Sequence, residues 1–216
     1  MWNRQIPMNK ADRVIFFCCL LILSVMCTSF RWPLSTVKLT STFGESRGDH
    51  LHDGVDIVSY DTRVYPVADS AVLYAWNSSY FPFENFTGSG NYLILDHGET
   101  ASIYLHLEDS LALSPNYTTN QSVGHFANTG RSYGAHIHFG LYDRISWDSI
   151  NFFSVIEAPQ DDTPPVVDHM AFYIDGTYTR ISNNASIRLT QHYPLLLNVY
   201  DTISKGDRFG IYKMTV

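Results

Sequence analysis

Cysteine is nearly absent from this 216-residue sequence, and its absence limits the cross-links and metal sites that the chain can build. The three cysteines, Cys18, Cys19 and Cys27, all fall in the first apolar segment. The rest of the chain therefore has no disulfide framework, and a metal site there must use His, Asp and Glu ligands. Zinc-finger-like structural sites, which need cysteine, are excluded.

Basic charge and helical periodicity are also scarce. The formal net charge is -7, so the basic face that a nucleic-acid partner requires is not expected. After Trp32 no stretch repeats apolar residues at helical spacing over three turns. Short β-type runs alternate instead with Gly-, Asn- and Asp-rich turns, as in Ala71–Trp76, Tyr92–Leu95 and His136–Leu141. We therefore predict a mainly β protein.

The longest apolar run, Val14 to Met26, is interrupted by Ser24 and is shorter than the ~20 residues of a membrane-spanning helix. Basic residues precede it: Arg4, Lys10 and Arg13. A basic segment before a short apolar one is typical of secretory signals. We predict that residues 1–31 are a signal peptide or N-terminal membrane anchor, and that the chain is exported and contacts the membrane only through this segment.

Cys27 adds a second interpretation of the same segment, because it can serve as the lipid-attachment cysteine of a bacterial lipoprotein. The alternatives are an uncleaved anchor and cleavage near Thr28 and Ser29.

A domain boundary is predicted at residues 159–165, where three prolines and two aspartates favour an extended, solvated linker. Residues 32–158 then form the first domain. Residues 166–216 have an alternating strand pattern that resembles the start of an immunoglobulin-like sandwich, but with fewer strands than the ~7 expected. We predict a partial, truncated domain; the alternative is a small β appendage completed by a partner strand.

Three histidine-containing motifs carry the chemistry. In His52-Asp53-Gly54-Val55-Asp56 two metal-ligand types flank a glycine that lets the backbone bend. In His136-Ile137-His138 both imidazoles project from one face of a strand. In Tyr104-Leu105-His106-Leu107 the same alternation places Tyr104 and His106 on one face. Taken singly, these motifs also fit a turn histidine, a surface pair and a half-buried strand.

Together the motifs supply the parts for amide hydrolysis. Two histidines and one aspartate are a catalytic zinc set, with the fourth position left for water. Two further histidines remain to move a proton and to stabilise an oxyanion. The other histidines are interpreted as loop, surface or packing residues: His50, His97, His125, His169 and His192. For His50 a minor substrate role is also open, because it lies so near His52.

Between Leu39 and Tyr142 the sequence resembles the lysostaphin-like (LytM-type) zinc metallopeptidases, which cut peptidoglycan peptides. The resemblance rests on Thr42-Phe43-Gly44 with Arg47, on the three histidine motifs, and on the stretches Val64–Asp69, Gly90–Gly98 and Asn128–Phe139. It departs from the family at Ser70, Tyr133 and Ala135, which concerns loop shape and substrate fit but not the metal.

The resemblance implies a mostly antiparallel β-sheet peptidase domain with one Zn²⁺ per chain, held by His52, Asp56 and His138. His106 and His136 take the catalytic roles, one as general base and the other as oxyanion stabiliser, in an order that the sequence leaves open. Asn91, Tyr104 and Tyr133 are candidates for the substrate groove, with Asn77–Ser89 as the loop that forms one of its walls.

The implied function is hydrolysis of peptide bonds in the stem peptides or cross-bridges of bacterial peptidoglycan by an exported, cell-envelope enzyme. One alternative is a non-catalytic regulator or wall-binding module on the same fold, although such relatives typically lose ligands that this chain retains. The other is a truncated gene product, folded or not.

Overall fold

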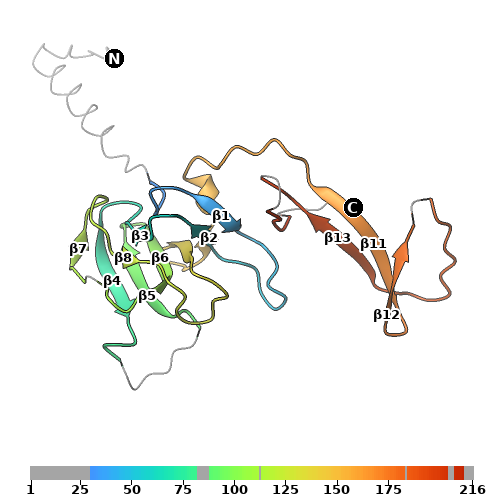
Figure 1. The fold of residues 1–216 in the computed structure, drawn as a ribbon, viewed down its shortest axis with the longest axis horizontal. Helices are drawn as coiled ribbons and strands as arrows, with labels where there is room; N and C mark the ends of the chain where they lie inside the picture. Colours follow the sequence, from blue (N-terminus) through green and yellow to red (C-terminus); the bar gives the residue numbers. More distant parts are fainter. Residues whose placement is uncertain (1–29, 82–87, 112, 183, 204–206, 212–216) are drawn as a thin grey trace, which may run out of the picture. The chain divides into compact units, whose positions relative to one another are not determined.

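The computed structural model describes residues 30–81, 88–111, 113–182, 184–203 and 207–211 (Figure 1). The predicted signal or anchor, including Cys27, lies almost wholly outside these residues. Within the described part, no helix is long and apolar enough to cross a bilayer.

Eight strands form the main sheet, in the order β1-β2-β9-β6-β5-β4-β7, with β10 paired to β9. Every pairing in it is antiparallel. The strands are β1 (Lys38–Ser41), β2 (Val55–Val58), β4 (Ser70–Trp76), β5 (Asn91–Asp96), β6 (Thr100–Leu107), β7 (Asn116–Tyr117), β9 (Ile137–Asp143) and β10 (Ser149–Ile150). A two-stranded sheet of β3 (Arg63–Val64) and β8 (Gly124–His125) and a 3₁₀ turn, η1 (Phe152–Ser154), complete this part.

The core lies on one face of the main sheet, because its strands alternate apolar and polar residues. On β9 the side chains of Ile137, Phe139 and Leu141 are fully buried. The centroid of the Phe139 ring lies 4.6 Å from that of Phe152 and 5.3 Å from that of Tyr104. Since successive residues of a strand point to opposite faces, His138 must lie on the other face. The predicted mainly antiparallel β fold is confirmed.

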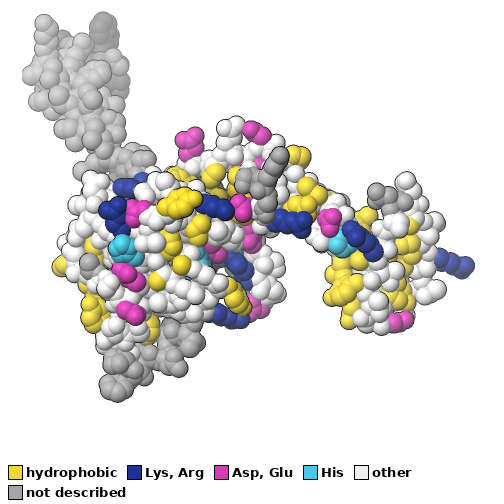
Figure 2. Space-filling model, viewed as in Figure 1, with side chains coloured by type: hydrophobic (Ala, Val, Ile, Leu, Met, Phe, Trp, Pro, Cys, Tyr) yellow, Lys and Arg dark blue, Asp and Glu magenta, His cyan; other side chains and the backbone are white. Residues whose placement is uncertain are grey.

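A separate three-stranded sheet follows, with the order β12-β11-β13. Its strands are β11 (Val166–Ile174), β12 (Thr177–Ile181) and β13 (Leu195–Tyr200). Many of its apolar side chains are exposed, and Figure 2 shows hydrophobic side chains over this sheet. Residues 159–165, between η1 and β11, have no helix or strand. The described residues form one sheet here and not a sandwich, so the immunoglobulin-like assignment and the domain boundaries stay predictions.

Tyr104 corrects a prediction made from strand alternation. Its side chain is 0% exposed, and its hydroxyl accepts hydrogen bonds from the Val67 N–H at 3.0 Å and from Ser102 Oγ at 3.1 Å. It therefore belongs to the core and does not line a groove. The alternation fails because His106 has a φ of 62°, a left-handed backbone conformation that turns the end of β6.

We expect Tyr104→Phe to lower the free energy of unfolding by about 1–3 kcal/mol, because it leaves the buried Val67 N–H without an acceptor. Urea unfolding of wild type and variant measures this. Tyr133→Phe is the matched control: Tyr133 is 101% exposed, so its loss of a hydroxyl should change stability by less than about 0.5 kcal/mol. Equal stability of the Tyr104 variant and wild type would contradict the role given to this hydroxyl.

Candidate metal centre

The pairing of β2 with β9 brings two of the predicted ligands together. Asp56 and His138 are direct cross-strand partners, and His52 reaches them from the loop before β2. His52 Nε2 lies 3.0 Å from His138 Nδ1 and 3.1 Å from Asp56 Oδ1, and the latter two atoms are 3.1 Å apart. Three ligand atoms of the types that bind zinc thus converge. The residues fit a divalent metal.

Hydrogen bonds on the outer side orient two of these ligands. His52 Nδ1 lies 2.9 Å from the Thr42 carbonyl oxygen, which makes Nδ1–H the donor and leaves the Nε2 lone pair facing the centre. Arg47 donates to Asp56 Oδ2 at 2.9 Å and to Ser41 Oγ at 2.6 Å. Oδ1, the other carboxylate oxygen, is the one that faces the two histidines.

The glycine of the first motif is required by close packing. A Cβ atom at Gly54 would lie 2.4 Å from the carbonyl oxygen of Phe139 and 2.8 Å from His138 Nε2. Only a residue without a side chain lets the loop pass this close to β9. His52 and Asp56 can therefore flank His138 as the sequence motif predicted.

The charges of the ligands are coupled. Burial favours a neutral Asp56, but the hydrogen bond from His138 and the close contact with His52 outweigh it and hold the pKa of Asp56 far below its usual range. Burial likewise opposes the charge of His138, yet hydrogen bonds to Asp53 and Asp56 raise its pKa to about 9. In the metal-free protein the His138 ring is therefore protonated on both nitrogens, and positively charged, at neutral pH.

The two predicted catalytic histidines lie together beside the ligands. The ring centroids of His106 and His136 are 4.7 Å apart, and His136 Nε2 is 3.6 Å from Asp56 Oδ1. His106 Nδ1 lies 2.8 Å from the Thr129 carbonyl oxygen, and His136 Nδ1 lies 2.8 Å from that of Gly134. In both rings Nδ1–H is thus the hydrogen-bond donor to a backbone carbonyl, and Nε2 takes no part in these two hydrogen bonds. Burial lowers the pKa of His106 to about 4, so it is neutral and able to accept a proton.

All five of these side chains line one cavity of about 730 Å³. His50, Arg131 and Tyr133 also line it, so Tyr133 lies where the groove was predicted, although substrate contact by Tyr133 remains a prediction. Asn91 is a correction, because it is 1% exposed and its amide bonds the Leu107 carbonyl oxygen. Of the predicted wall loop, Gly88 and Ser89 at its C-terminal end contribute to the lining, whereas residues 82–87 lie outside the described residues.

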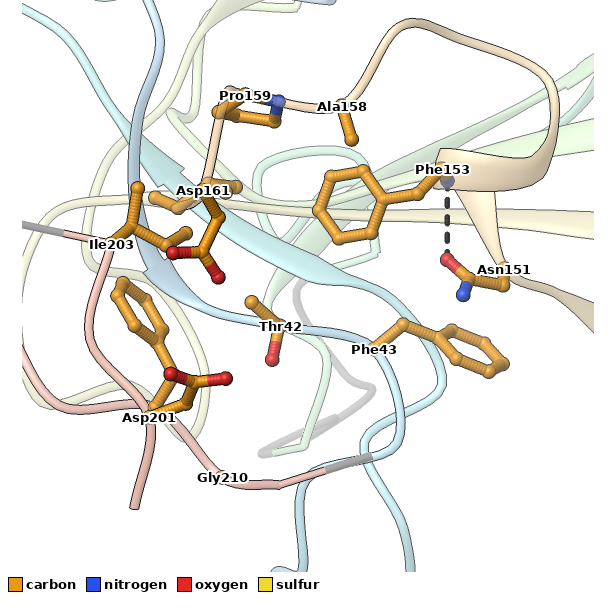
Figure 3. Close-up of a pocket in the computed structure, with 12 residues that line it drawn as sticks. Thr42, Phe43, Asn151, Phe153, Ala158, Pro159, Asp161, Asp201, Ile203 and Gly210 are labelled. Carbon is orange, nitrogen blue, oxygen red and sulfur yellow. Dashed lines mark hydrogen bonds between the residues drawn. The ribbon is translucent and has the colours of Figure 1, made fainter. Parts of the chain in front are cut away.

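A second cavity, of about 220 Å³, is formed by residues near β1, η1 and the segment after β13 (Figure 3). Its lining is largely apolar, with Phe43, Phe153 and Phe209 among the contributors, and none of the lining residues is histidine. Asn151 accepts a hydrogen bond from the Phe153 N–H and so caps η1 at its edge. Of these two cavities, the larger one contains the histidine cluster.

Asp53 is the residue at the centre that sequence reasoning missed. It lies inside the first motif, between the predicted ligand His52 and the glycine. Its Oδ1 is 3.4 Å from His138 Nε2. The motif spacing alone carries no signal for this contact, because His138 lies 85 residues further along the chain.

Comparisons with known proteins agree with this geometry. Residues 50–151 match the model of peptidase family M23. Over 96 residues the chain is 33% identical to the peptidoglycan DD-endopeptidase ShyA of Vibrio cholerae, an alignment that covers 43% of this chain and 20% of that protein. The chain thus spans about a fifth of the length of this relative. The predicted resemblance to LytM-type peptidases is confirmed over residues 50–151, the stretch that matches the family M23 model.

Solved structures with a similar fold include a zinc-containing peptidase from Vibrio cholerae and the catalytic domain of lysostaphin from Staphylococcus simulans. The first is 23% identical, with a TM-score of 0.47, over 57% of this chain and 39% of that one. The second is 20% identical, with a TM-score of 0.47, over 56% of this chain and 93% of that one.

Metal binding should depend on pH, because a metal must displace the proton of His138. With the pKa of His138 raised to about 9, the apparent affinity should fall about tenfold per pH unit below that value for each proton displaced. Competition between the protein and a chromogenic chelator for Zn²⁺, from pH 6.5 to 8.5, measures the slope. An affinity that does not change over this range would contradict a protonated His138.

Proposed function

We propose that this chain is an exported zinc metalloendopeptidase that hydrolyses peptide bonds of bacterial peptidoglycan. The observation that carries the proposal is the convergence of His52, Asp56 and His138 beside His106 and His136 in one cavity. The family match and the peptidoglycan endopeptidase among its relatives support peptidoglycan hydrolysis. Zinc, one per chain, is the finer part of the proposal, and it rests on the ligand types and their spacing.

The proposed peptidase domain is residues 32–158, which is longer than the matched stretch. Its first part is supported by β1, which pairs with β2 in the main sheet, and by a hydrogen bond from the Tyr65 N–H to the Pro33 carbonyl oxygen. The N-terminal segment, residues 1–31, would deliver this domain to the cell envelope, as a cleaved signal, a membrane anchor or a lipoprotein signal with Cys27.

In the proposed mechanism, His52, Asp56 and His138 would hold the zinc, which when bound would lower the pKa of water toward ~7 and polarise the scissile carbonyl. In this proposal the peptide lies in the cavity, between these ligands and the pair His106 and His136. One ring accepts the proton of the attacking water at Nε2, and the other stabilises the negative charge that develops on the carbonyl oxygen. The backbone carbonyls of Thr129 and Gly134 accept Nδ1–H from the two rings and so leave Nε2 for the reaction. The ring that accepts the proton starts with Nε2 unprotonated, whereas the ring that stabilises the oxyanion must carry a proton on Nε2 to donate.

Replacing either catalytic histidine should separate activity from metal binding. We expect His106→Ala and His136→Ala to lower peptidoglycan cleavage by at least ~100-fold, the usual cost of losing a proton-transfer group, while the protein still binds about one zinc. Release of soluble peptide fragments from purified peptidoglycan, with zinc content measured on the same samples, gives both values.

The matched control is His125→Ala, because His125 contacts Thr62 and does not line the cavity. This variant should cleave like wild type. Wild-type protein that binds zinc but cleaves no peptidoglycan from several chemotypes would favour the non-catalytic regulator on the same fold.

Replacing a ligand should remove the metal itself. His138→Ala deletes one of the three converging donors, so we expect the zinc content to fall from about one per chain to near zero and cleavage to be lost. Elemental analysis after dialysis measures the metal. A His138→Ala protein that keeps its full zinc content would show that the metal is held elsewhere.

A further inference from the structure

A carboxylate that the proposed mechanism does not use lies behind the ligand His138. The Nδ1 atom of this ring faces His52 and Asp56, whereas Nε2 points the opposite way and lies 3.4 Å from Asp53 Oδ1. The His138 side chain is 11% exposed, so few other partners can reach Nε2. Asp53 is therefore placed to accept the proton of Nε2–H when Nδ1 binds a metal.

Tyr142 holds this carboxylate in place. Its hydroxyl donates to Asp53 Oδ2 at 2.6 Å, so the two carboxylate oxygens have different partners. Tyr142 follows His138 by four residues on β9, and both side chains lie on the same face of the strand. The Asp53 side chain is 50% exposed, and without Tyr142 water would compete for it and the side chain would be free to turn away.

Two glycines make room for this row of side chains. A Cβ at Gly140, between His138 and Tyr142, would lie 2.8 Å from Cε2 of the Tyr142 ring. A Cβ at Gly54 would lie 2.8 Å from His138 Nε2. The Tyr142 ring therefore lies over Gly140, on the same face of β9 as the ring of His138. The close packing at both glycines shows that the arrangement is built into the local backbone.

We propose that Asp53 and Tyr142 are positioning residues for the metal ligand His138. Asp53 keeps the ring proton on Nε2, so that the lone pair of Nδ1 faces the metal, and Tyr142 fixes the Asp53 carboxylate. Partners of this kind behind a ligating histidine typically contribute 10- to 100-fold to metal affinity. The inference rests on the metal site of the proposed function, but not on its substrate.

The test is the Zn²⁺ affinity of the full-length chain, measured by chelator competition at fixed pH for wild type and variants. We expect Asp53→Ala to bind about 10- to 100-fold more weakly, and Tyr142→Phe to lose less. Because Tyr142 acts through Asp53, the double variant should bind no more weakly than Asp53→Ala alone. Asp53→Asn, which keeps an acceptor oxygen without the charge, should recover part of the affinity.

Asp49→Ala is the matched control, because Asp49 lines the same cavity and contacts His50 but no ligand. It should bind Zn²⁺ like wild type, and thermal unfolding of the metal-free proteins should give similar midpoints for the Asp49 and Asp53 variants. A loss of affinity that is matched by a loss of metal-free folding would overturn a positioning role.

The remaining outcomes separate the two proposals. Wild type that binds Zn²⁺ no better than Asp53→Ala, with both tight, would overturn the inference and leave the metal site intact. Additive effects of the Asp53 and Tyr142 substitutions would overturn the proposed order of action. Wild type that binds no Zn²⁺ at all would instead contradict the proposed function itself.

Discussion

The antiparallel pairing of β2 with β9 is the constraint on which the rest of the centre depends. It sets Asp56 directly opposite His138, so a carboxylate and an imidazole meet on the face of the sheet away from the core. Because side chains alternate along a strand, a one-residue slip of either strand would turn its own site residue into the core and bring that strand's apolar residues out. The burial of Ile57, Ile137 and Phe139 on the opposite face opposes such a slip. The apolar core thus determines the geometry of the polar site.

Holding several polar groups so close together is costly unless each has a partner. The centre meets this cost with contacts directed outward: Thr42 for His52, Arg47 for Asp56 and Asp53 for His138. Each contact also selects which atom faces inward. The surrounding groups therefore determine the charge and tautomer of the ligands as well as their position.

The sequence predicts a structural feature well when that feature depends on neighbouring residues, and poorly when it depends on residues far apart in the chain. Strand alternation predicted the mainly β fold, and the motifs predicted the ligand set that the structure brings together. Prediction failed for Tyr104, since the left-handed backbone at His106 breaks the alternation on which it relied. It failed for Asn91 because the side-chain amide donates hydrogen bonds to the Leu107 backbone carbonyl and to the Asp109 carboxylate, and so points into the protein. Neither the backbone conformation at His106 nor the hydrogen bonds of Asn91 can be predicted from the spacing of residues in the sequence.

What the sequence by itself determined is the set of chemical groups: His, Asp and His as candidate ligands, two further histidines, and a glycine where the backbone must bend. Their types and short-range order follow from local chemistry. Only the tertiary structure decided which atoms meet, because the partners are far apart in the chain, as Asp53 is from Tyr142. A contact across two strands depends on register and on space, and here Gly54 and Gly140 leave that space.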